Sequence, residues 1–276
     1  MTRIRGKAYN GELSDPFPDV VRIEPAGFCN FHCRHCPVGR EGGRRGVLSF
    51  DYFKLYFGKL PLIPRVLVLY HGGEPLLNPA LFDIIHYARA VGVCKLVLNT
   101  NASKITDQMD FSELDDLRVS FDGTSPAEND KIRKGGEFKW NARRVRVLAK
   151  SKHAPKQITI YNINTIGRPA DYLLDFFKGY PVTFRSDPMK VWPRMDAMRC
   201  RQANSPTYCP NLWETFTILA NGDVVMCCND LLGEDVQGNL KDEWALAVWV
   251  RMQKVRDGFK KKEYPKLCQS CWRLLQ

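Results

Sequence analysis

"VVRIEPAGFCNFHCRHCPVGR", residues 20–40, is the stretch that decides the fold. Its apolar beginning, residues 20–27, is typical of a β-strand, and Cys29, Cys33 and Cys36 follow at once. Three residues separate the first two cysteines, and two separate the last two. A structural zinc ion takes four ligands, and an iron–sulfur cubane usually takes four thiolates. Three clustered thiols therefore predict either a fourth ligand from elsewhere or a metal centre with one open position.

The composition is that of an ordinary globular protein. Of the 276 residues, 44% are hydrophobic and 26% are charged. No apolar run approaches the ~20 residues of a membrane span, and the basic, polar N-terminus lacks the apolar core of a signal peptide. We therefore predict a cytoplasmic protein. In that compartment, ten cysteines indicate metal binding or catalysis rather than disulfides.

The formal net charge is +11, but the basic residues do not form one block. The densest stretches, residues 144–153 and 256–262, have the pattern of solvated helix faces. A basic surface attracts an acidic redox partner, an anionic substrate or nucleic acid. We rank the redox partner first and nucleic acid last, and we expect no membrane partner.

Apolar runs alternate with amphipathic runs along the first two thirds of the chain. The expected strands are residues 20–27, 95–102, 116–123, 157–164 and 182–188, together with a strand within residues 65–75 that ends in a glycine turn. The clearest helices between them are 49–60, 78–92, 137–152 and 169–180. Strands that are apolar on both faces predict a parallel sheet covered by helices. We therefore expect an α/β fold, a partial (β/α)6 TIM barrel, with the active site at the C-terminal ends of its strands.

The pattern changes after residue 188. A hairpin is expected around Asn221-Gly222, followed by an amphipathic helix over residues 240–259 and a tail that contains Cys268 and Cys271. So small a unit needs a staple to be stable. We therefore expect an N-terminal extension, 1–19; the barrel, 20–188; a connection, 189–208; and a small, stapled C-terminal α+β domain, 209–276.

The Cys-x3-Cys-x2-Cys loop after a first parallel strand resembles that of the radical S-adenosylmethionine (SAM) enzymes. The resemblance implies that Cys29, Cys33 and Cys36 hold a 4Fe–4S cluster whose open iron chelates the amino and carboxylate groups of SAM. Four further stretches, "HGGEP", "NTNA", "VSFDG" and "ENDKIRKGGEFKW", resemble SAM-binding motifs of this family, although Ala102 stands where glycine is usual. The SAM-binding residues implied are Gly72, Gly73, Glu74, Asn99, Asn101, Ser120, Asp122 and Arg133.

The second cysteine set has Cys209, then Gly222 after twelve residues and Cys227 after four more. This spacing resembles the opening of a SPASM domain, and the closing Cys268-x2-Cys271 resembles its shorter twitch version. The resemblance implies one auxiliary 4Fe–4S cluster held by these four cysteines. A four-cysteine zinc site is equally compatible with the spacing alone. Adjacent cysteines on a strand point to opposite faces, and the glycine spacing favours Cys227 over Cys228 as the ligand.

The overall pattern resembles the twitch-containing aminocyclitol dehydrogenases. The resemblance implies hydrogen abstraction from a small-molecule substrate by a 5′-deoxyadenosyl radical, with oxidation of a secondary alcohol to a ketone. An auxiliary cluster with four thiolates leaves no iron open to substrate, which suits it to accept the second electron. A flavodoxin or ferredoxin-type protein is the implied electron donor. The expected substrate contacts, at strand ends, are Tyr161, Asn162, Asn164, Arg185 and Asp187, with structural hydrogen bonding as the alternative for each.

Other functions remain open. An epimerase would need a thiol to return hydrogen to the substrate, and Cys200 on the connection could supply it. A peptide-modifying maturase is disfavoured, because such enzymes often carry a leader-binding domain before the barrel and the first expected strand already begins near Val20. A zinc-stapled protein that binds nucleic acid is favoured only by the basic charge.

Overall fold

The computed structural model of the protein describes residues 15–41, 46–188, 206–269 and 271. Six strands follow one another as expected and pair in parallel, each with the next in sequence. They are β1 (Val20–Ile23), β2 (Val66–Val68), β3 (Lys95–Thr100), β4 (Asp116–Asp122), β5 (Ile158–Asn164) and β6 (Thr183–Pro188). The predicted partial-barrel fold is confirmed.

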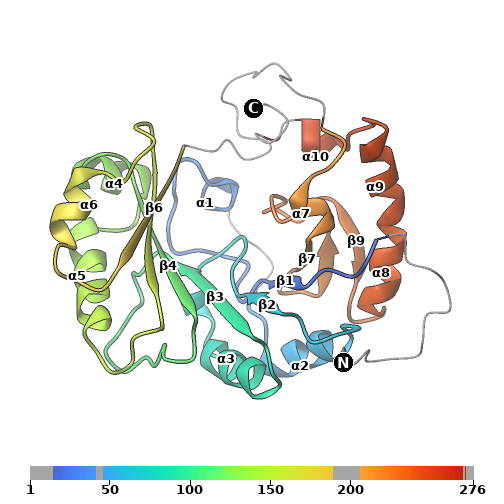
Figure 1. Cartoon of the computed structure of the whole chain (residues 1–276), viewed down its shortest axis with the longest axis horizontal. Coiled ribbons are helices and arrows are strands. Elements are labelled where there is room, and N and C mark those ends of the chain that lie inside the picture. The colour runs from blue at the N-terminus through green and yellow to red at the C-terminus, as the bar shows by residue number, and fades with distance from the viewer. Residues whose placement is uncertain (1–14, 42–45, 189–205, 270, 272–276) are drawn as a thin grey trace.

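The sheet is curved, and helices cover its convex face (Figure 1). The helices of this half are α1 (Pro37–Glu41), α2 (Phe50–Gly58), the 3-10 turn η1 (Pro75–Leu77), α3 (Leu81–Ala90), α4 (Pro126–Ile132), α5 (Phe138–Ala149) and α6 (Asp171–Phe176). Strand residues alternate between the two faces. In β1, Val21 and Ile23 are fully buried, whereas Arg22 is half-buried and faces the concave side. The concave face can therefore carry polar side chains at low cost.

The C-terminal region contains α7 (Pro210–Trp213), β7 (Thr215–Ile218), β8 (Asp223–Val225), β9 (Val236–Asn239), α8 (Ala245–Arg251), α9 (Gln253–Lys260) and α10 (Lys266–Gln269). β7 and β8 form the expected antiparallel hairpin, and Gly222 in its turn has a φ of +92°. The single helix expected over residues 240–259 is instead two helices, α8 and α9, which meet at Met252.

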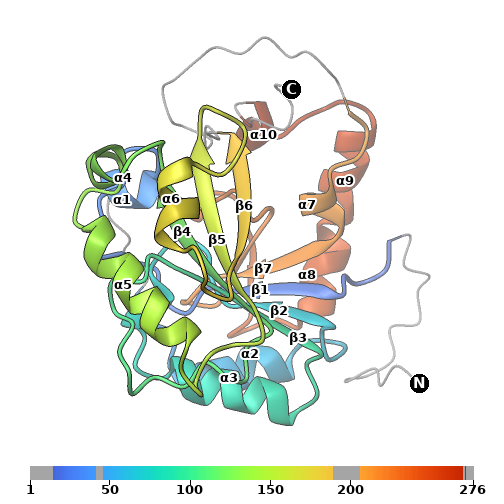
Figure 2. The same ribbon diagram turned by 60° about the vertical axis from the view of Figure 1, so that its left-hand side comes forward.

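The two halves share one sheet, which the expected division into separate domains did not foresee. β7 pairs in parallel with β1 along its whole length, so nine strands run in the order β6-β5-β4-β3-β2-β1-β7-β8-β9. Figure 2 shows β7 beside β1, with α8 and α9 on the far side of the C-terminal strands. The open edge of β1 would otherwise leave a row of backbone groups unpaired. Within the described residues, no helix has the length and apolar character needed to cross a membrane.

Candidate active site

The loop of the three N-terminal cysteines is held by a segment distant in sequence. The backbone N–H of His32 donates to the Lys134 carbonyl at 2.7 Å, and that of Arg34 donates to the Ile132 carbonyl at 3.0 Å. Between them, Phe31 is buried against Gly136, where an added Cβ would lie 2.3 Å from the Phe31 Cζ atom. The motif "RKGGEF" therefore contains glycine because the cysteine loop lies directly on its backbone.

Gly73, in the turn after β2, is packed equally closely. An added Cβ would lie 2.2 Å from the Ala26 carbonyl oxygen and 2.4 Å from that of Phe28. The neighbouring Glu74 N–H donates to the Phe28 carbonyl at 3.0 Å. The turn predicted to bind SAM is thus attached to the backbone just before Cys29.

Glu74 lies inside this turn rather than at its surface. Its Oε1 accepts from the Thr100 hydroxyl at 2.6 Å, and its Oε2 accepts from the Asn101 N–H at 2.8 Å. The side chain is buried, and burial raises the pKa of its carboxyl group. Glu74 therefore positions the "NTNA" turn, and its predicted role in SAM binding is an indirect one through that turn.

The "NTNA" turn closes over the first cysteine. Asn101 Nδ2 lies 3.8 Å from the Cys29 sulfur and donates to the Asn30 side chain at 3.1 Å. Ala102, in the usual place of glycine, has a φ of +64°, the left-handed conformation that glycine adopts without strain. On the neighbouring strands, the Ser120 hydroxyl donates to Asn99 Oδ1 at 3.2 Å.

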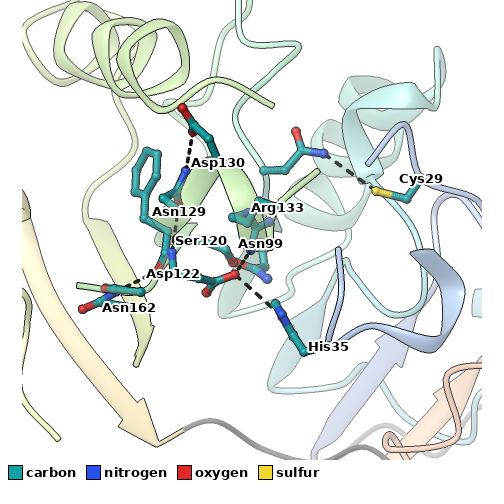
Figure 3. Close-up of polar contacts among 12 residues, drawn as sticks. Cys29, His35, Asn99, Ser120, Asp122, Asn129, Asp130, Arg133 and Asn162 are labelled. Carbon is teal, nitrogen blue, oxygen red and sulfur yellow. Dashed lines mark hydrogen bonds and ion pairs between the residues drawn. The ribbon is translucent and has the colours of Figure 1, made fainter. Parts of the chain in front are cut away.

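Asp122 and Arg133 form an ion pair beside the cysteine loop (Figure 3). Arg133 Nη1 lies 2.8 Å from Asp122 Oδ2, and the His35 Nε2 atom lies 3.7 Å from the same oxygen. Arg133 is the C-cap residue of α4, and little of either side chain of the pair is exposed. Burial lowers the pKa of Arg133, but the charges of Asp122 and Cys33 outweigh it and raise the pKa overall.

This pair retains unused polar atoms. Within the described residues, Asp122 Oδ1 and Arg133 Nε are buried and have no hydrogen-bond partner. Buried polar atoms without partners are rare and usually mark a site that a ligand completes. The free oxygen of Asp122 can accept a hydrogen bond from an amino group, and the free N–H of Arg133 can donate one to a carboxylate. An amino acid, such as the methionine part of SAM, carries both groups.

The three cysteines of the loop are better suited to bind a metal cluster than to exist as unbound thiolates. Burial raises the pKa of Cys29 to about 12 and also raises the pKa values of Cys33 and Cys36. A thiolate here therefore needs positive charge close by, which iron would supply. The buried guanidinium of Arg133 lies near these sulfurs and adds to that charge. The residues present fit a cluster held by three cysteines.

The second cysteine set surrounds a single cavity of about 140 Å³. Its lining includes the four predicted ligands, Cys209, Cys227, Cys268 and Cys271. Asn229 joins two of them: its backbone N–H lies 3.4 Å from the Cys227 sulfur, and its Nδ2 lies 3.5 Å from the Cys271 sulfur. Within the described residues, no three His, Cys, Asp or Glu side chains converge as ligands of a single ion would. Four thiols around a cavity fit a cluster, whose thiolates are spread over several irons.

Cys228 is not part of that lining, but its side chain is hydrogen-bonded to Cys227, and this bond is the main cause that raises the pKa of Cys227. Cys228 is half-buried, and its charge acts on Arg22 and on Tyr70. The structure thus places Cys227 at the cavity and Cys228 beside the concave face of β1. Cys200, the candidate hydrogen donor of an epimerase, lies outside the described residues.

The five expected substrate contacts divide into two groups. Asn162 Nδ2 donates to the Phe121 and Gly123 carbonyls at 3.0 and 3.1 Å, and Asn164 Oδ1 accepts from two backbone N–H groups of the following loop. Both side chains are buried, and these hydrogen bonds hold the strand ends and the following loop in place. Tyr161 and Arg185 are partners in register on β5 and β6, and the Tyr161 hydroxyl donates to Asp187.

The sequence interpretation missed Glu24. This fully buried side chain accepts from the Gly72 N–H through Oε1 and from the Ala220 N–H through Oε2, both at 3.2 Å. It therefore links the predicted SAM turn to the hairpin of the C-terminal half. The available signal was an acidic residue directly after a mainly apolar strand, just before the cysteine loop.

Comparisons with known proteins agree with this geometry. The family description Radical SAM superfamily matches residues 23–170, and SPASM, an iron–sulfur cluster-binding domain, matches residues 209–272. An AdoMet-dependent heme synthase of Methanosarcina barkeri is 28% identical over 140 residues, 49% of this chain and 40% of that protein. The mycofactocin maturase MftC of Mycobacterium tuberculosis is 30% identical over 138 residues, 48% of this chain and 34% of that protein. The matches thus cover about two fifths or less of these relatives.

Among solved structures, BtrN in complex with AdoMet and 2-DOIA is similar, with a TM-score of 0.62 and 15% identity. The similarity covers 93% of this chain and 94% of BtrN. At that identity it shows the shared fold. The two family matches imply SAM, a SAM-binding 4Fe–4S cluster and an auxiliary iron–sulfur cluster as cofactors. With its barrel matched over residues 23–170, the chain belongs to the radical SAM superfamily.

Proposed function

We propose that this radical SAM enzyme is a dehydrogenase that oxidises a secondary alcohol of a sugar, cyclitol or similar small molecule to a ketone. The observation that carries the proposal is the cavity lined by Cys209, Cys227, Cys268 and Cys271. Four thiols leave no ligand position for a substrate, so this centre is suited to receive an electron. Net oxidation of a substrate needs such an acceptor.

The roles of the residues follow from their positions. Cys29, Cys33 and Cys36 would hold the first cluster, and the four cavity cysteines would hold the auxiliary one. Asp122 and Arg133 would bind the amino and carboxylate groups of SAM through the buried atoms that the protein leaves free. When bound, SAM and its cluster supply the radical that removes a substrate hydrogen atom, and the auxiliary cluster supplies an acceptor for the remaining electron.

The remaining candidates for substrate contacts lie on β5 and β6. Tyr161 is half-buried, and burial together with its hydrogen bond to Asp187 raises its pKa. It is therefore a neutral hydrogen-bonding group near pH 7. Arg185 is exposed beside it and would contribute a positive charge. These three side chains would orient polar groups of the substrate.

The comparisons support a small molecule without identifying it. BtrN was solved with 2-DOIA, whereas SuiB of Streptococcus suis was solved with a precursor peptide, and both share the fold of this chain. The similarity to BtrN extends over nearly the full length of both chains, which favours the small molecule. We further propose a flavodoxin or ferredoxin-type electron donor, which the net charge of +11 would attract if it is acidic.

The product mass tests the proposal. We would incubate the reconstituted enzyme with dithionite, SAM and a panel of cyclitols, aminocyclitols and sugars. A dehydrogenase yields a product lighter by two hydrogens and one 5′-deoxyadenosine per product. An unchanged mass in light water with one deuterium gained in heavy water would instead establish an epimerase. In that case Cys200→Ala should stop turnover, whereas oxidation should survive this substitution.

A further inference from the structure

A cluster of polar side chains on the concave face of the sheet takes no part in the sites described above. Tyr70 follows β2 and directly precedes the "HGGEP" turn. Arg22 of β1 donates through Nη1 to the Tyr70 carbonyl at 3.0 Å, and its guanidinium lies 4.5 Å from the centre of the Tyr70 ring. Arg118 of β4 donates through Nη1 to the Tyr70 hydroxyl at 3.2 Å. Two guanidinium groups from different strands thus converge on one phenol.

Of the two arginines, only Arg118 has a carboxylate partner among the described residues. The Arg118 Nε lies 2.8 Å from Asp116 Oδ2. Asp116 is occupied on its other oxygen as well, by the Thr159 hydroxyl at 2.8 Å. Within the described part of the chain, no carboxylate forms an ion pair with Arg22, and its buried Nε has no hydrogen-bond partner. Arg22 is half-buried, and burial lowers its pKa, but the charges of Tyr70 and Cys228, rather than of a carboxylate, raise that pKa overall. Its unpartnered Nε can therefore still donate to an anion.

A second buried donor lies next to Arg22. Thr217 of β7 is the register partner of Arg22, and paired residues of neighbouring strands project from the same face. Thr217 is 1% exposed, and its hydroxyl has no hydrogen-bond partner among the described residues. A guanidinium N–H and a hydroxyl are both donors to oxyanions. The unpartnered N–H of Arg22 and the unpartnered hydroxyl of Thr217 lie side by side, so both could donate to one oxyanion.

The two guanidinium groups act on the phenol of Tyr70. Burial alone raises the pKa of a tyrosine, yet the charges of Arg22 and Arg118 outweigh burial and lower the pKa of Tyr70. The cluster also lies where a substrate would be needed. Arg118 is the register partner of Asn99, a predicted SAM residue, and Cys228 next to the auxiliary cavity acts on both Arg22 and Tyr70. Arg22, Tyr70 and Arg118 are therefore adjacent to residues of both predicted iron–sulfur sites.

We propose that Arg22, Tyr70, Arg118 and Thr217 form a binding site for an oxyanion, a phosphate or a carboxylate, that belongs to the substrate. This inference rests on the proposed function in one respect, that the substrate occupies the concave face of the barrel. It narrows the substrate class from polar small molecules to those that carry an anionic group. The bidentate guanidinium of Arg22 would bind the anion, and the Thr217 hydroxyl would fix its orientation.

Anion binding can be measured without turnover. Inorganic phosphate and succinate would each be titrated into the reconstituted, SAM-free holoenzyme by calorimetry at constant ionic strength. We expect saturable binding of at least one probe, and the stronger probe identifies phosphate or carboxylate as the natural group. Arg22→Gln should weaken it at least tenfold, and Thr217→Val should weaken it severalfold. Arg168→Gln is the matched control, because Arg168 is exposed and its charge is paired with Asp171.

Two results would overturn the site: no saturable binding of either probe to the wild type, or equal weakening in Arg168→Gln. If Arg22→Gln loses iron or folds poorly, Arg22→Lys replaces it. The lysine keeps the charge but not the planar fork, so binding should weaken while remaining measurable, and unchanged affinity would contradict the proposal. A wild type that binds an anion through Arg22 but never forms 5′-deoxyadenosine would refute the proposed function and retain the site. An enzyme that oxidises its substrate but binds no anion through Arg22 would retain the proposed function and refute the site.

Discussion

The two cysteine-bearing regions of the molecule are built in opposite ways. The three N-terminal cysteines lie within one loop, and the protein around them closes that loop from several sides: by the backbone of residues 132–136, by the Gly73 turn and by Asn101. The four C-terminal cysteines come from three separate segments, and they meet only around their cavity. Packing of the protein fixes the first set of cysteines in place, whereas the second set would be joined by the cluster that it binds.

The difference has a physical basis in what each segment can bury. The N-terminal loop rests on the barrel core, with Phe31 buried beneath it. The last segment, which carries Cys268 and Cys271, is anchored mainly through Tyr264, whose hydroxyl donates to the Pro206 carbonyl at 2.9 Å and whose ring lies 4.8 Å from that of Phe259. Within the described residues, α10 has no buried side chain. A short segment with so few buried groups needs a metal to remain ordered.

The largest expected effect comes from removing the first set. Replacing Cys29, Cys33 and Cys36 together with alanine should abolish 5′-deoxyadenosine formation. The iron content should fall from about eight to about four per chain, because the second set keeps its own cluster. Iron analysis and chromatography of the reaction measure both. Loss of all iron would contradict two independent centres.

Removing one ligand of the second set should act differently. Cys271→Ala should stop product formation but still permit slow cleavage of SAM. Because the cluster joins the last segment to the hairpin, hydrogen exchange after Phe259 should also rise strongly, while exchange in the N-terminal cysteine loop stays unchanged. Mass spectrometry of exchanged peptides measures both regions in one experiment. An equal rise in hydrogen exchange in the two regions would show that the two cysteine sets do not differ in how they are held.

A smaller change tests the protein framework of the first set. In Gly73→Ala, the new Cβ would clash with two backbone carbonyls that cannot move independently, at 2.2 and 2.4 Å. We expect SAM cleavage to fall at least tenfold. Gly58→Ala is the matched control, because nothing lies within 4 Å of a Cβ at that helix end. Normal SAM cleavage by Gly73→Ala would show that the turn accommodates a Cβ at residue 73, and would contradict the prediction.

The smallest expected effect concerns the sheet that both regions share. Burial raises the pKa of Asp115, but hydrogen bonds from Lys156, Arg89 and the Leu96 N–H outweigh it and lower the pKa to about 2. The folded pKa is below the unfolded value, so this stabilisation is full above about pH 4 and is lost as the pH falls through about 2. Asp115→Asn should therefore remove about 2 kcal/mol at neutral pH and little at pH 2.

The same variant shows whether the nine strands unfold together. Denaturation followed by hydrogen exchange separately in β3 and β7 peptides should give one midpoint, lowered equally in both by Asp115→Asn. A midpoint lowered in β3 alone would mean that the C-terminal strands unfold on their own, despite their pairing with β1.

The sequence by itself was sufficient for the fold class, and its resemblance to a known family was sufficient for the cofactors. Both depend on features that are local in the chain: apolar runs with a period of two, glycine turns, and cysteines at a fixed spacing. The six parallel strands and the hairpin around Asn221-Gly222 followed from these patterns. Even the departure at Ala102 was visible, although only the structure shows that its φ is +64°.

Only the tertiary structure decided how these parts are joined. The pairing of β7 with β1 involves residues almost two hundred positions apart, and no local pattern encodes the choice of a strand edge. For the same reason, the sequence could not show that Glu24 links the Gly72 and Ala220 backbones, or that Arg22 and Thr217 lie side by side with unused donors. Burial and the pairing of polar groups depend on the surroundings of each residue in space. Motifs that are local in the chain carry the family resemblance that implies the cofactors, and long-range packing determines where a substrate can be held.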